Sequence, residues 1–191
     1  VEVFGLDDII LDIENKSLTH RPDCFGIIGF AREVAGILGQ KFNEPDFLFR
    51  ESVFSEGFLV ETKDGVESKD SKIKIGISDT KICPRYTGAL VKVVEATAEE
   101  KYLAPIQIEI AKSGMMTKSK IVDITNYLML LTGQPLHAFD ADKFLAVGKT
   151  EIPEINVRLA RVGEKIVLLD DTEAELNEND IVICSGEVPV A

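Results

Sequence analysis

The sequence predicts an α+β fold of mixed, mainly antiparallel sheets with packed helices, preceded by a short strand-helix piece. Residues 72–78 alternate strictly between apolar and polar side chains, which is typical of a strand with one buried face. Apolar residues recur every three or four positions from Phe25 to Leu38, which indicates an amphipathic helix of about four turns. Because strands and helices follow one another without a regular β-α-β alternation, an α+β class is favoured over a doubly wound sheet.

The first elements are expected to be a strand and a helix. Ile9–Glu14 ends in apolar/polar alternation and is interpreted as a strand. Asp23 is expected to cap the start of the helix, and Gly39 is expected to end it. Residues from about 40 to 71 show no sustained period, so we interpret them as a linker with room for one short element.

Two strands and a helix are expected to follow. The strands are predicted over 72–78, at a sheet edge, and over 85–94, and together they are expected to start one sheet. Thr97–Glu100 has the spacing of a capping box, which predicts a helix that runs to about Lys112. Pro105 lies inside this helix and predicts either a bend or a delayed start.

A second helix and three strands complete the expected fold. Asp123 is expected to cap a helix over about Ile124–Leu131, and Gly133 is expected to stop it. Apolar/polar alternation then returns in three stretches that we predict to be strands: Ile155–Ala160, Lys165–Leu168 and Asp180–Cys184.

Composition and charge exclude several classes of protein. The 191 residues are 45% hydrophobic, enough for a sizeable core, and the net charge of −12 argues against a general grip on nucleic-acid phosphates. Any RNA would therefore be met at one end, in a local pocket. Cys24, Cys83 and Cys184 form no Cys-x-x-Cys pair, which argues against a disulfide framework or a zinc site and favours a reducing cytosol. No signal peptide and no apolar run of about 20 residues is present, so no membrane partner is expected.

Both ends of the sequence look cut. The chain begins at Val1 in place of Met, and it stops at Val190-Ala191 directly after an apolar turn. We therefore expect a piece of a longer protein.

Two stretches have several polar residues close together between apolar ones, a pattern that is typical of binding or catalytic sites. In the first, Thr19–Cys24, Arg21 and Asp23 flank a proline near a helix start, and we interpret them as a local ion pair with an N-cap. In the second, Thr125 and Asn126 lie near a helix start, while Gln134, Pro135 and His137 lie just past the helix end.

This second cluster could present a hydroxyl, amides and an imidazole to one ligand in one cleft. A histidine with a pKa of about 6.5 can position or activate water near neutral pH. The alternative is a buried, hydrogen-bonded histidine that locks the turn. No serine or cysteine forms a nucleophile motif with His137, His20 is too distant for a known metal-ligand spacing, and no phosphate-binding glycine motif is present.

The same residues carry a family resemblance. In this order, five stretches of the chain resemble the beta subunit of bacterial-type phenylalanyl-tRNA synthetases, over about 9–39 and 83–191. These stretches are Arg21-Pro22-Asp23 with Gly29–Ala35, Cys83–Thr87, Val122–Leu130 with Gly133–Asp140, Val157–Ala160 and Leu168–Asp170.

The resemblance implies an aminoacyl-tRNA synthetase subunit in a cytoplasmic heterotetramer of two alpha and two beta subunits. It implies that 1–41 end the preceding beta-subunit domain, 42–71 form a linker, and 72–191 form an editing domain truncated at its C-terminal end. That domain would hydrolyse tyrosine misattached to phenylalanine tRNA, whose acceptor end it would meet. No cofactor is implied in this part, while ATP and Mg²⁺ would bind elsewhere in the whole enzyme.

The resemblance also implies roles for single residues. His137 would orient water or the ester as the catalytic residue, Thr125 and Asn126 would hydrogen-bond the substrate, and Pro135 and Gln134 would line the substrate site. A glycine-rich segment with a glutamate that reads the tyrosine hydroxyl would follow Ala191.

Two alternatives remain open at this point. The stretch 114–120 reads Gly-Met-Met-Thr-Lys-Ser-Lys where the family has Gly-x-Arg-Pro-x-Asn-Asn, and this difference motivates an editing-deficient structural and tRNA-docking domain. A freestanding member of the same domain superfamily is the other alternative. Arg21-Pro22-Asp23 and Ala31-Arg32-Glu33 argue against it, because they resemble the neighbouring beta-subunit domain.

Overall fold

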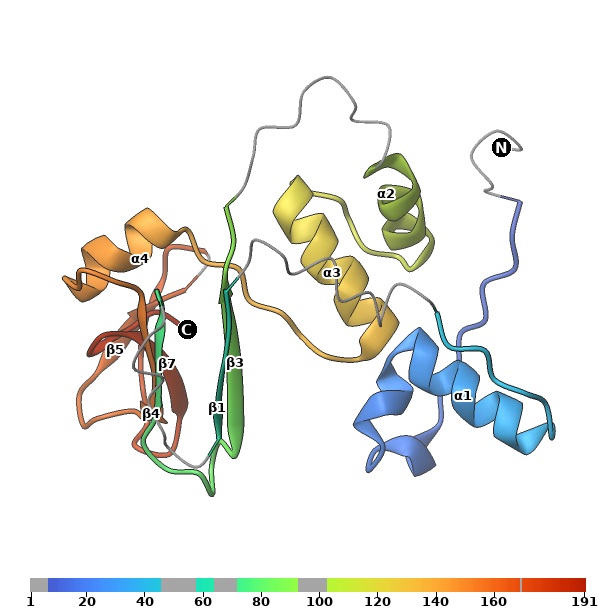
Figure 1. Cartoon of the computed structure of the whole chain (residues 1–191), viewed down its shortest axis with the longest axis horizontal. Coiled ribbons are helices and arrows are strands. Elements are labelled where there is room, and N and C mark those ends of the chain that lie inside the picture. The colour runs from blue at the N-terminus through green and yellow to red at the C-terminus, as the bar shows by residue number, and fades with distance from the viewer. Residues whose placement is uncertain (1–6, 46–57, 64–71, 93–102, 169) are drawn as a thin grey trace. The chain divides into compact units, whose positions relative to one another are not determined.

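The structure is a computed structural model that describes residues 7–45, 58–63, 72–92, 103–168 and 170–191 (Figure 1). Its contacts divide the chain into two compact units, each assembled from two separate stretches of sequence. Unit 1 joins Val1–Arg50 to Val94–Ala138, and unit 2 joins Glu51–Val93 to Phe139–Ala191. The division into 1–41, 42–71 and 72–191 follows the family resemblance and stays a prediction.

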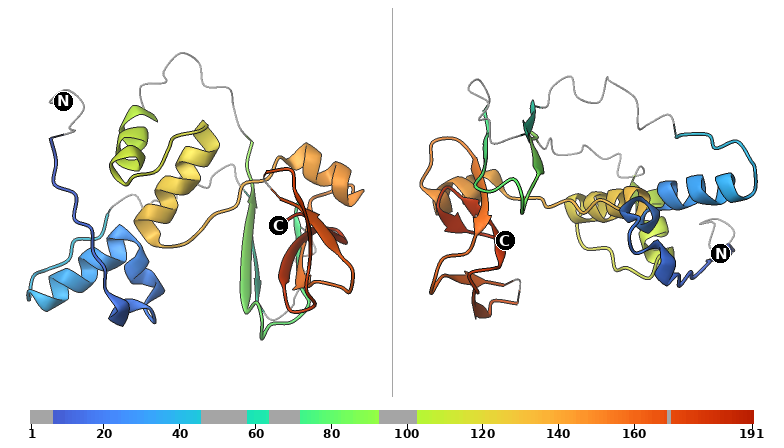
Figure 2. Two further views of the ribbon diagram at one scale, coloured as in Figure 1. Left: turned by 180° about the vertical axis from the view of Figure 1, so that it is seen from behind. Right: turned by 90° about the horizontal axis from the view of Figure 1, so that it is seen from below.

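Helices make up the regular structure described in unit 1. Helix α3 contacts α1, α2 and η3, and it lies beside α2 in each view (Figures 1 and 2). The elements are the short 3-10 helices η2, Lys16–Leu18, and η3, Pro22–Phe25, and the α-helices α1, Ile27–Ile37, α2, Leu103–Lys112, and α3, Lys120–Thr132.

Helix α1 begins later than the sequence predicts. Its N-cap is Gly26, and the expected cap Asp23 lies within η3 instead, because both of its carboxylate oxygens accept hydrogen bonds from Arg21, at 2.9 and 2.8 Å. The predicted stop is confirmed, since Gly39 has φ +63° just past the end of the helix. The end of α2 at Lys112 is also confirmed, whereas the Thr97–Glu100 capping box lies outside the described residues.

The strand predicted over Ile9–Glu14 is wrong. This stretch has no regular secondary structure, and the side chains of Ile9 and Leu11 are 84% and 75% exposed. Alternation produces a strand only where a neighbouring strand pairs its backbone and a core covers its apolar face. Among the described residues, this stretch has neither.

Unit 2 contains every strand that the structure describes. Four of them form a sheet in the order β2-β4-β7-β8, in which β2 and β4 are parallel and the other neighbours are antiparallel. Strands β1 and β3 form an antiparallel pair, and so do β5 and β6. The strands are β1, Phe58–Lys63, β2, Lys74–Ile77, β3, Arg85–Leu90, β4, Glu154–Leu159, β5, Lys165–Val167, β6, Glu173–Glu175, β7, Ile181–Ser185, and β8, Val188–Pro189.

The predicted strands β2 to β5 and β7 are confirmed, with one error of pairing. The edge position of β2 is confirmed, but β2 and β3 do not start one sheet. Strand β3 pairs with β1 instead, and the partner of β2 is β4, which lies far along the sequence. The described helices together with mostly antiparallel strands confirm the α+β class.

The core of unit 2 includes side chains of the four-stranded sheet and of helix α4, Ala141–Gly148, and Tyr86 of β3 packs against it. The sequence analysis does not predict this helix, although its N-cap Asp140 accepts hydrogen bonds from the backbone N–H groups of residues 142 and 143. Phe144 of α4 joins the buried cluster and packs against Phe139, with ring centroids 5.1 Å apart. The cluster consists of Ile73, Ile75, Phe144, Ile155 and Val157.

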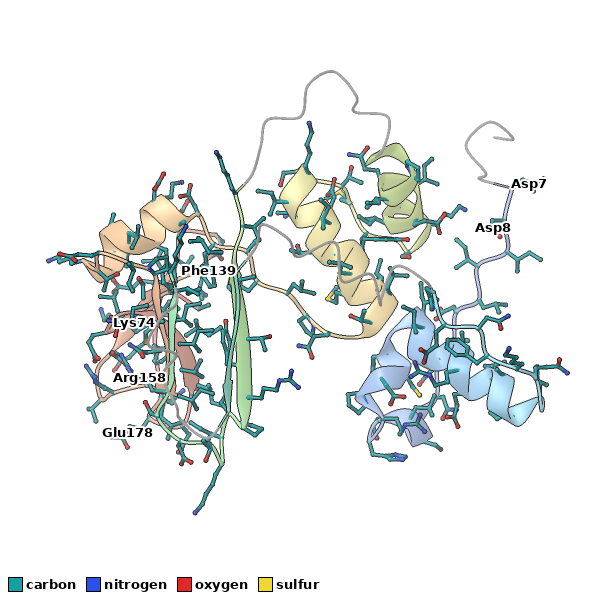
Figure 3. The ribbon with its side chains drawn as sticks, in the orientation of Figure 1. Asp7, Asp8, Lys74, Phe139, Arg158 and Glu178 are labelled. Atoms are coloured by element: carbon teal, nitrogen blue, oxygen red, sulfur yellow. The ribbon has the colours of Figure 1, made fainter. Side chains whose placement is uncertain are left out.

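A buried ion pair ties β4 to the loop that follows it. The Arg158 guanidinium lies among the strands of unit 2 (Figure 3) and donates to both oxygens of Glu164, at 2.8 and 2.6 Å. It also donates to the Glu187 carbonyl at 2.8 Å. Hydrogen bonding to Arg158 lowers the pKa of Glu164 from its ordinary 4.5 to about 2, so the pair stays charged over a wide pH range.

No helix among the described residues is both long and apolar enough to cross a membrane.

Candidate functional site

Helix α3 carries the first half of the candidate site, and both of its ends are capped. Its N-cap is Ser119, whose hydroxyl accepts a hydrogen bond from the N–H of Val122 at 3.4 Å. The expected stop is confirmed, because Gly133 adopts φ 75° and its N–H donates to the Met129 carbonyl at 2.8 Å. The helix therefore begins before the predicted residue Ile124.

Asp123 is not the cap that the sequence predicts. It lies inside the first turns of α3, where it is 1% exposed. Its carboxylate accepts a hydrogen bond from the N–H of Lys118 at 2.8 Å and another from the Gln107 amide at 3.3 Å. This carboxylate therefore joins α2, the loop before α3 and α3 itself. The sequence signal for this role is an acidic residue between two apolar ones inside a helix.

Thr125 and Asn126 are half-buried on α3. The Thr125 hydroxyl donates to the Val122 carbonyl, one turn earlier, at 2.9 Å. Its proton is thus engaged within the helix, and its oxygen keeps lone pairs that can accept a hydrogen bond from a ligand. Asn126 follows on the helix and points about 100° away from Thr125.

The loop after α3 carries the second half of the site. The N–H of Gln134 donates to the Thr132 hydroxyl at 3.2 Å, and that hydroxyl in turn donates to the Leu128 carbonyl at 2.8 Å. The Gln134 side chain donates to the Pro135 carbonyl at 3.3 Å. These bonds tie the first loop residues back onto the helix.

His137 is exposed, like Gln134 and Pro135. The burial expected in the turn-locking alternative is therefore wrong. All five candidate residues belong to unit 1, but Thr125 lies eight positions before Gly133, about 12 Å along the helix axis. That Thr125, Asn126 and His137 share one ligand stays a prediction.

The structure brings the two polar stretches together, which the sequence analysis does not anticipate. A side chain at Gly133 would lie 2.7 Å from the Pro22 carbonyl and 3.0 Å from the N–H of Gly26, so the two backbones touch directly. The expected ion pair of Arg21 with Asp23 is confirmed and lowers the pKa of the Asp23 carboxyl through its hydrogen bonds. The sequence signals for this contact are two glycines: Gly26, just after the first stretch, and Gly133, within the second.

Comparison with known proteins identifies the family. Residues 82–191 match the B3/4 domain. The chain belongs to the B3/4 domain family. All five candidate residues lie within this match, whereas the Arg21–Gly26 segment that contacts Gly133 lies before it.

The relatives of this B3/4 domain protein include beta subunits of phenylalanine-tRNA ligase. Those of Thermosynechococcus vestitus and Carboxydothermus hydrogenoformans are 33% identical over 189 residues and 36% identical over 190, covering 99% and 100% of the chain. That of Vibrio parahaemolyticus is 36% identical over 190 residues, again 100% of the chain. The chain spans 20% to 21% of the length of these relatives. The resemblance to beta subunits is thereby confirmed.

Proposed function

We propose that this chain is part of a phenylalanine-tRNA ligase beta subunit and carries the site that hydrolyses tyrosine misattached to phenylalanine tRNA. The observation that carries the proposal is the placement of His137, exposed on a loop fixed to α3, within a chain that resembles such subunits along its whole length. Its proposed partners are the acceptor end of phenylalanine tRNA and the synthetase alpha subunit, in a cytoplasmic heterotetramer of two alpha and two beta subunits.

The reaction is the hydrolysis of an ester. Water attacks the carbonyl carbon of the tyrosyl ester, the bond to the ribose oxygen breaks, and that oxygen takes up a proton, which releases tyrosine and free tRNA. An imidazole within hydrogen-bond reach can hold the water, accept its proton and return one to the leaving oxygen. His137 is the exposed imidazole of this cluster and is assigned this role. ATP and Mg²⁺ serve amino-acid activation elsewhere in the enzyme.

Helix α3 is assigned to substrate binding. Because its proton is engaged by Val122, the Thr125 hydroxyl acts toward a ligand as an acceptor, which suits the protonated amino group of the amino acid. Asn126 offers both donors and acceptors, while Pro135 and Gln134 line the site from the loop.

A separate hydrolytic site compensates for the limited selectivity of amino-acid binding. An apolar pocket that fits phenylalanine discriminates poorly against an isostere that merely adds a hydroxyl, whereas a second site that hydrogen-bonds the phenol can select tyrosine strongly. Correction after attachment therefore achieves what the first binding step cannot.

A structural and tRNA-docking domain without editing activity is the second candidate. It is favoured by the stretch that leads into α3, where Met116 is 78% exposed and stands where the family has Arg, and Lys120 stands where the family has Asn. Two lysines beside a helix start can attract RNA phosphates without catalysing hydrolysis.

Release of tyrosine from tyrosylated phenylalanine tRNA tests the proposal. We expect His137→Ala, in the complete enzyme that contains this chain, to slow release by about 100-fold while phenylalanine charging persists. His20→Ala is the matched control, since His20 is an exposed histidine of the same unit outside the cluster. An enzyme that releases no tyrosine in its native form would favour the docking domain, and a fully active His137→Ala would remove His137 from the mechanism.

A further inference from the structure

We infer that Gly26 and Arg21 are positioning residues for the loop that carries His137. The segment Arg21–Gly26, called here the seat, receives the C-terminal end of α3 and thereby sets where that loop begins. The inference rests on the proposed function, because it assigns the seat to the hydrolysis for which His137 is proposed.

The contact between the seat and α3 tolerates no side chain. A methyl group at Gly26 would lie 2.8 Å from the Leu131 carbonyl and closer still to the Gly133 nitrogen. Non-bonded carbon atoms pack at about 3.5 Å or more, so even the smallest side chain requires a displacement on the order of 1 Å. Gly26 itself has φ −107°, which any residue adopts, so its requirement is steric and not conformational.

The seat is held rigidly on its own side. Arg21 donates to both carboxylate oxygens of Asp23, and its third nitrogen lies 3.0 Å from Glu33 on α1. A planar guanidinium that engages two carboxylates fixes direction as well as distance. The turn before Gly26 is thus fastened to the helix after it.

The backbone between the seat and the His137 imidazole has little conformational freedom. Gln134 follows Gly133 and is bonded back to Thr132, and as the residue before a proline it is restricted to extended backbone conformations. Pro135 has its φ angle fixed by its ring. Leu136 is then the remaining residue before His137. A displacement of the seat therefore displaces His137 by a similar amount.

The test compares Gly26→Ala with Gly36→Ala in the complete enzyme. We expect Gly26→Ala to lower the turnover number for tyrosine release by about 100-fold, because a misplacement of about 1 Å in a catalytic group costs that much, and to leave phenylalanine charging intact. Gly36 lies on the same helix α1 with open space around its α-carbon, so Gly36→Ala is expected to keep the native rate.

A further variant separates the seat from the helix cap. Gly26 is also the N-cap of α1, and alanine is a poor cap whereas serine is a good one. Gly26→Ser adds at least as much bulk and provides a good cap, so we expect it to lose tyrosine release as Gly26→Ala does. A native rate in Gly26→Ser together with a loss in Gly26→Ala would overturn the inference in favour of a capping role.

Backbone hydrogen exchange at Gly133 and Gln134, whose N–H groups donate to the Met129 carbonyl and the Thr132 hydroxyl, gives a readout independent of activity. We expect faster exchange at these amides in Gly26→Ala than in Gly36→Ala, so the seat is tested even if the native enzyme releases no tyrosine and the proposed function fails. If Gly26→Ala does not assemble, Arg21→Lys tests the inference instead. We expect it to lower turnover by about tenfold, because an ammonium lacks the rigid planar fork of donors that holds Asp23 and Glu33 in fixed directions. Arg32→Lys, on helix α1, is its control. Native release and unchanged exchange in the seat variants would overturn the inference.

Discussion

The two units are stabilised by different kinds of contact. Among the described residues, the buried apolar side chains of unit 1 are Ile28 and Ile110, whereas unit 2 holds the other eight. Unit 1 relies instead on the buried carboxylate of Asp123 and on the backbone contact between Gly26 and Gly133. Apolar burial is non-directional, while hydrogen bonds and backbone contacts fix geometry. Unit 2 adds directional contacts of Arg158 and Ser185 to its apolar core, whereas the candidate site lies in the unit with fewer buried apolar side chains.

The largest expected effect tests the apolar half of this comparison. Ile75 is 0% exposed at the centre of the cluster in unit 2, so Ile75→Ala should lower the free energy of unfolding by about 3 kcal/mol. Urea unfolding of the chain measures it. Ile9→Ala is the control, because an 84% exposed side chain should change stability by less than about 0.5 kcal/mol. Equal effects of the two substitutions would break the comparison.

The next effect concerns the polar contact of unit 2. Glu164→Gln should lower the free energy of unfolding by about 2 kcal/mol near neutral pH, because it leaves the buried Arg158 without its charged partner. Since folding lowers the pKa of Glu164 from 4.5 to about 2, this contribution is complete above pH 4.5 and is lost as the pH falls toward 2.

The native chain should therefore lose stability across that pH window more steeply than the variant, which urea unfolding at a series of pH values would show. Glu178→Gln removes the same charge from an exposed site and is the control. Parallel pH profiles for the native chain and Glu164→Gln would contradict the prediction.

The smallest expected effect sharpens the description of unit 1. Asp123→Asn replaces one acceptor oxygen by an N–H₂ group that faces donors. We therefore expect the free energy of unfolding to fall by about 1–2 kcal/mol. The loss should be accompanied by faster hydrogen exchange at the N–H of Lys118. Asp12→Asn, at an exposed position, is the control. An unchanged Lys118 amide would mean that the loop before α3 is held by something other than this carboxylate.

The errors of the sequence analysis have two physical origins, the absence of a pairing partner and the shortness of a pattern. Alternation predicts strands β2, β4 and β7 correctly, because each has one face on a core. The same alternation fails at Ile9–Glu14, where no partner strand is present among the described residues. Helix α4 escaped prediction because eight residues give too short a pattern, although Asp140 supplied a cap signal.

The sequence predicts the residues of the candidate site but not the contacts that hold them. Its residue types and order were visible in the sequence, and the structure places them all in unit 1, with His137 exposed. The seat was not predictable, because the sequence does not show that two glycines far apart along the chain will be in contact.

The sequence by itself determined the α+β class, the stop of α3 at Gly133 and the family, because periodicity, capping and motif order are local properties of the chain. Tertiary structure alone decided that β2 pairs with β4, that Asp123 bridges α2 and α3, and that Gly26 receives the end of α3. Each of these depends on two segments that are distant in sequence and meet only when the chain folds.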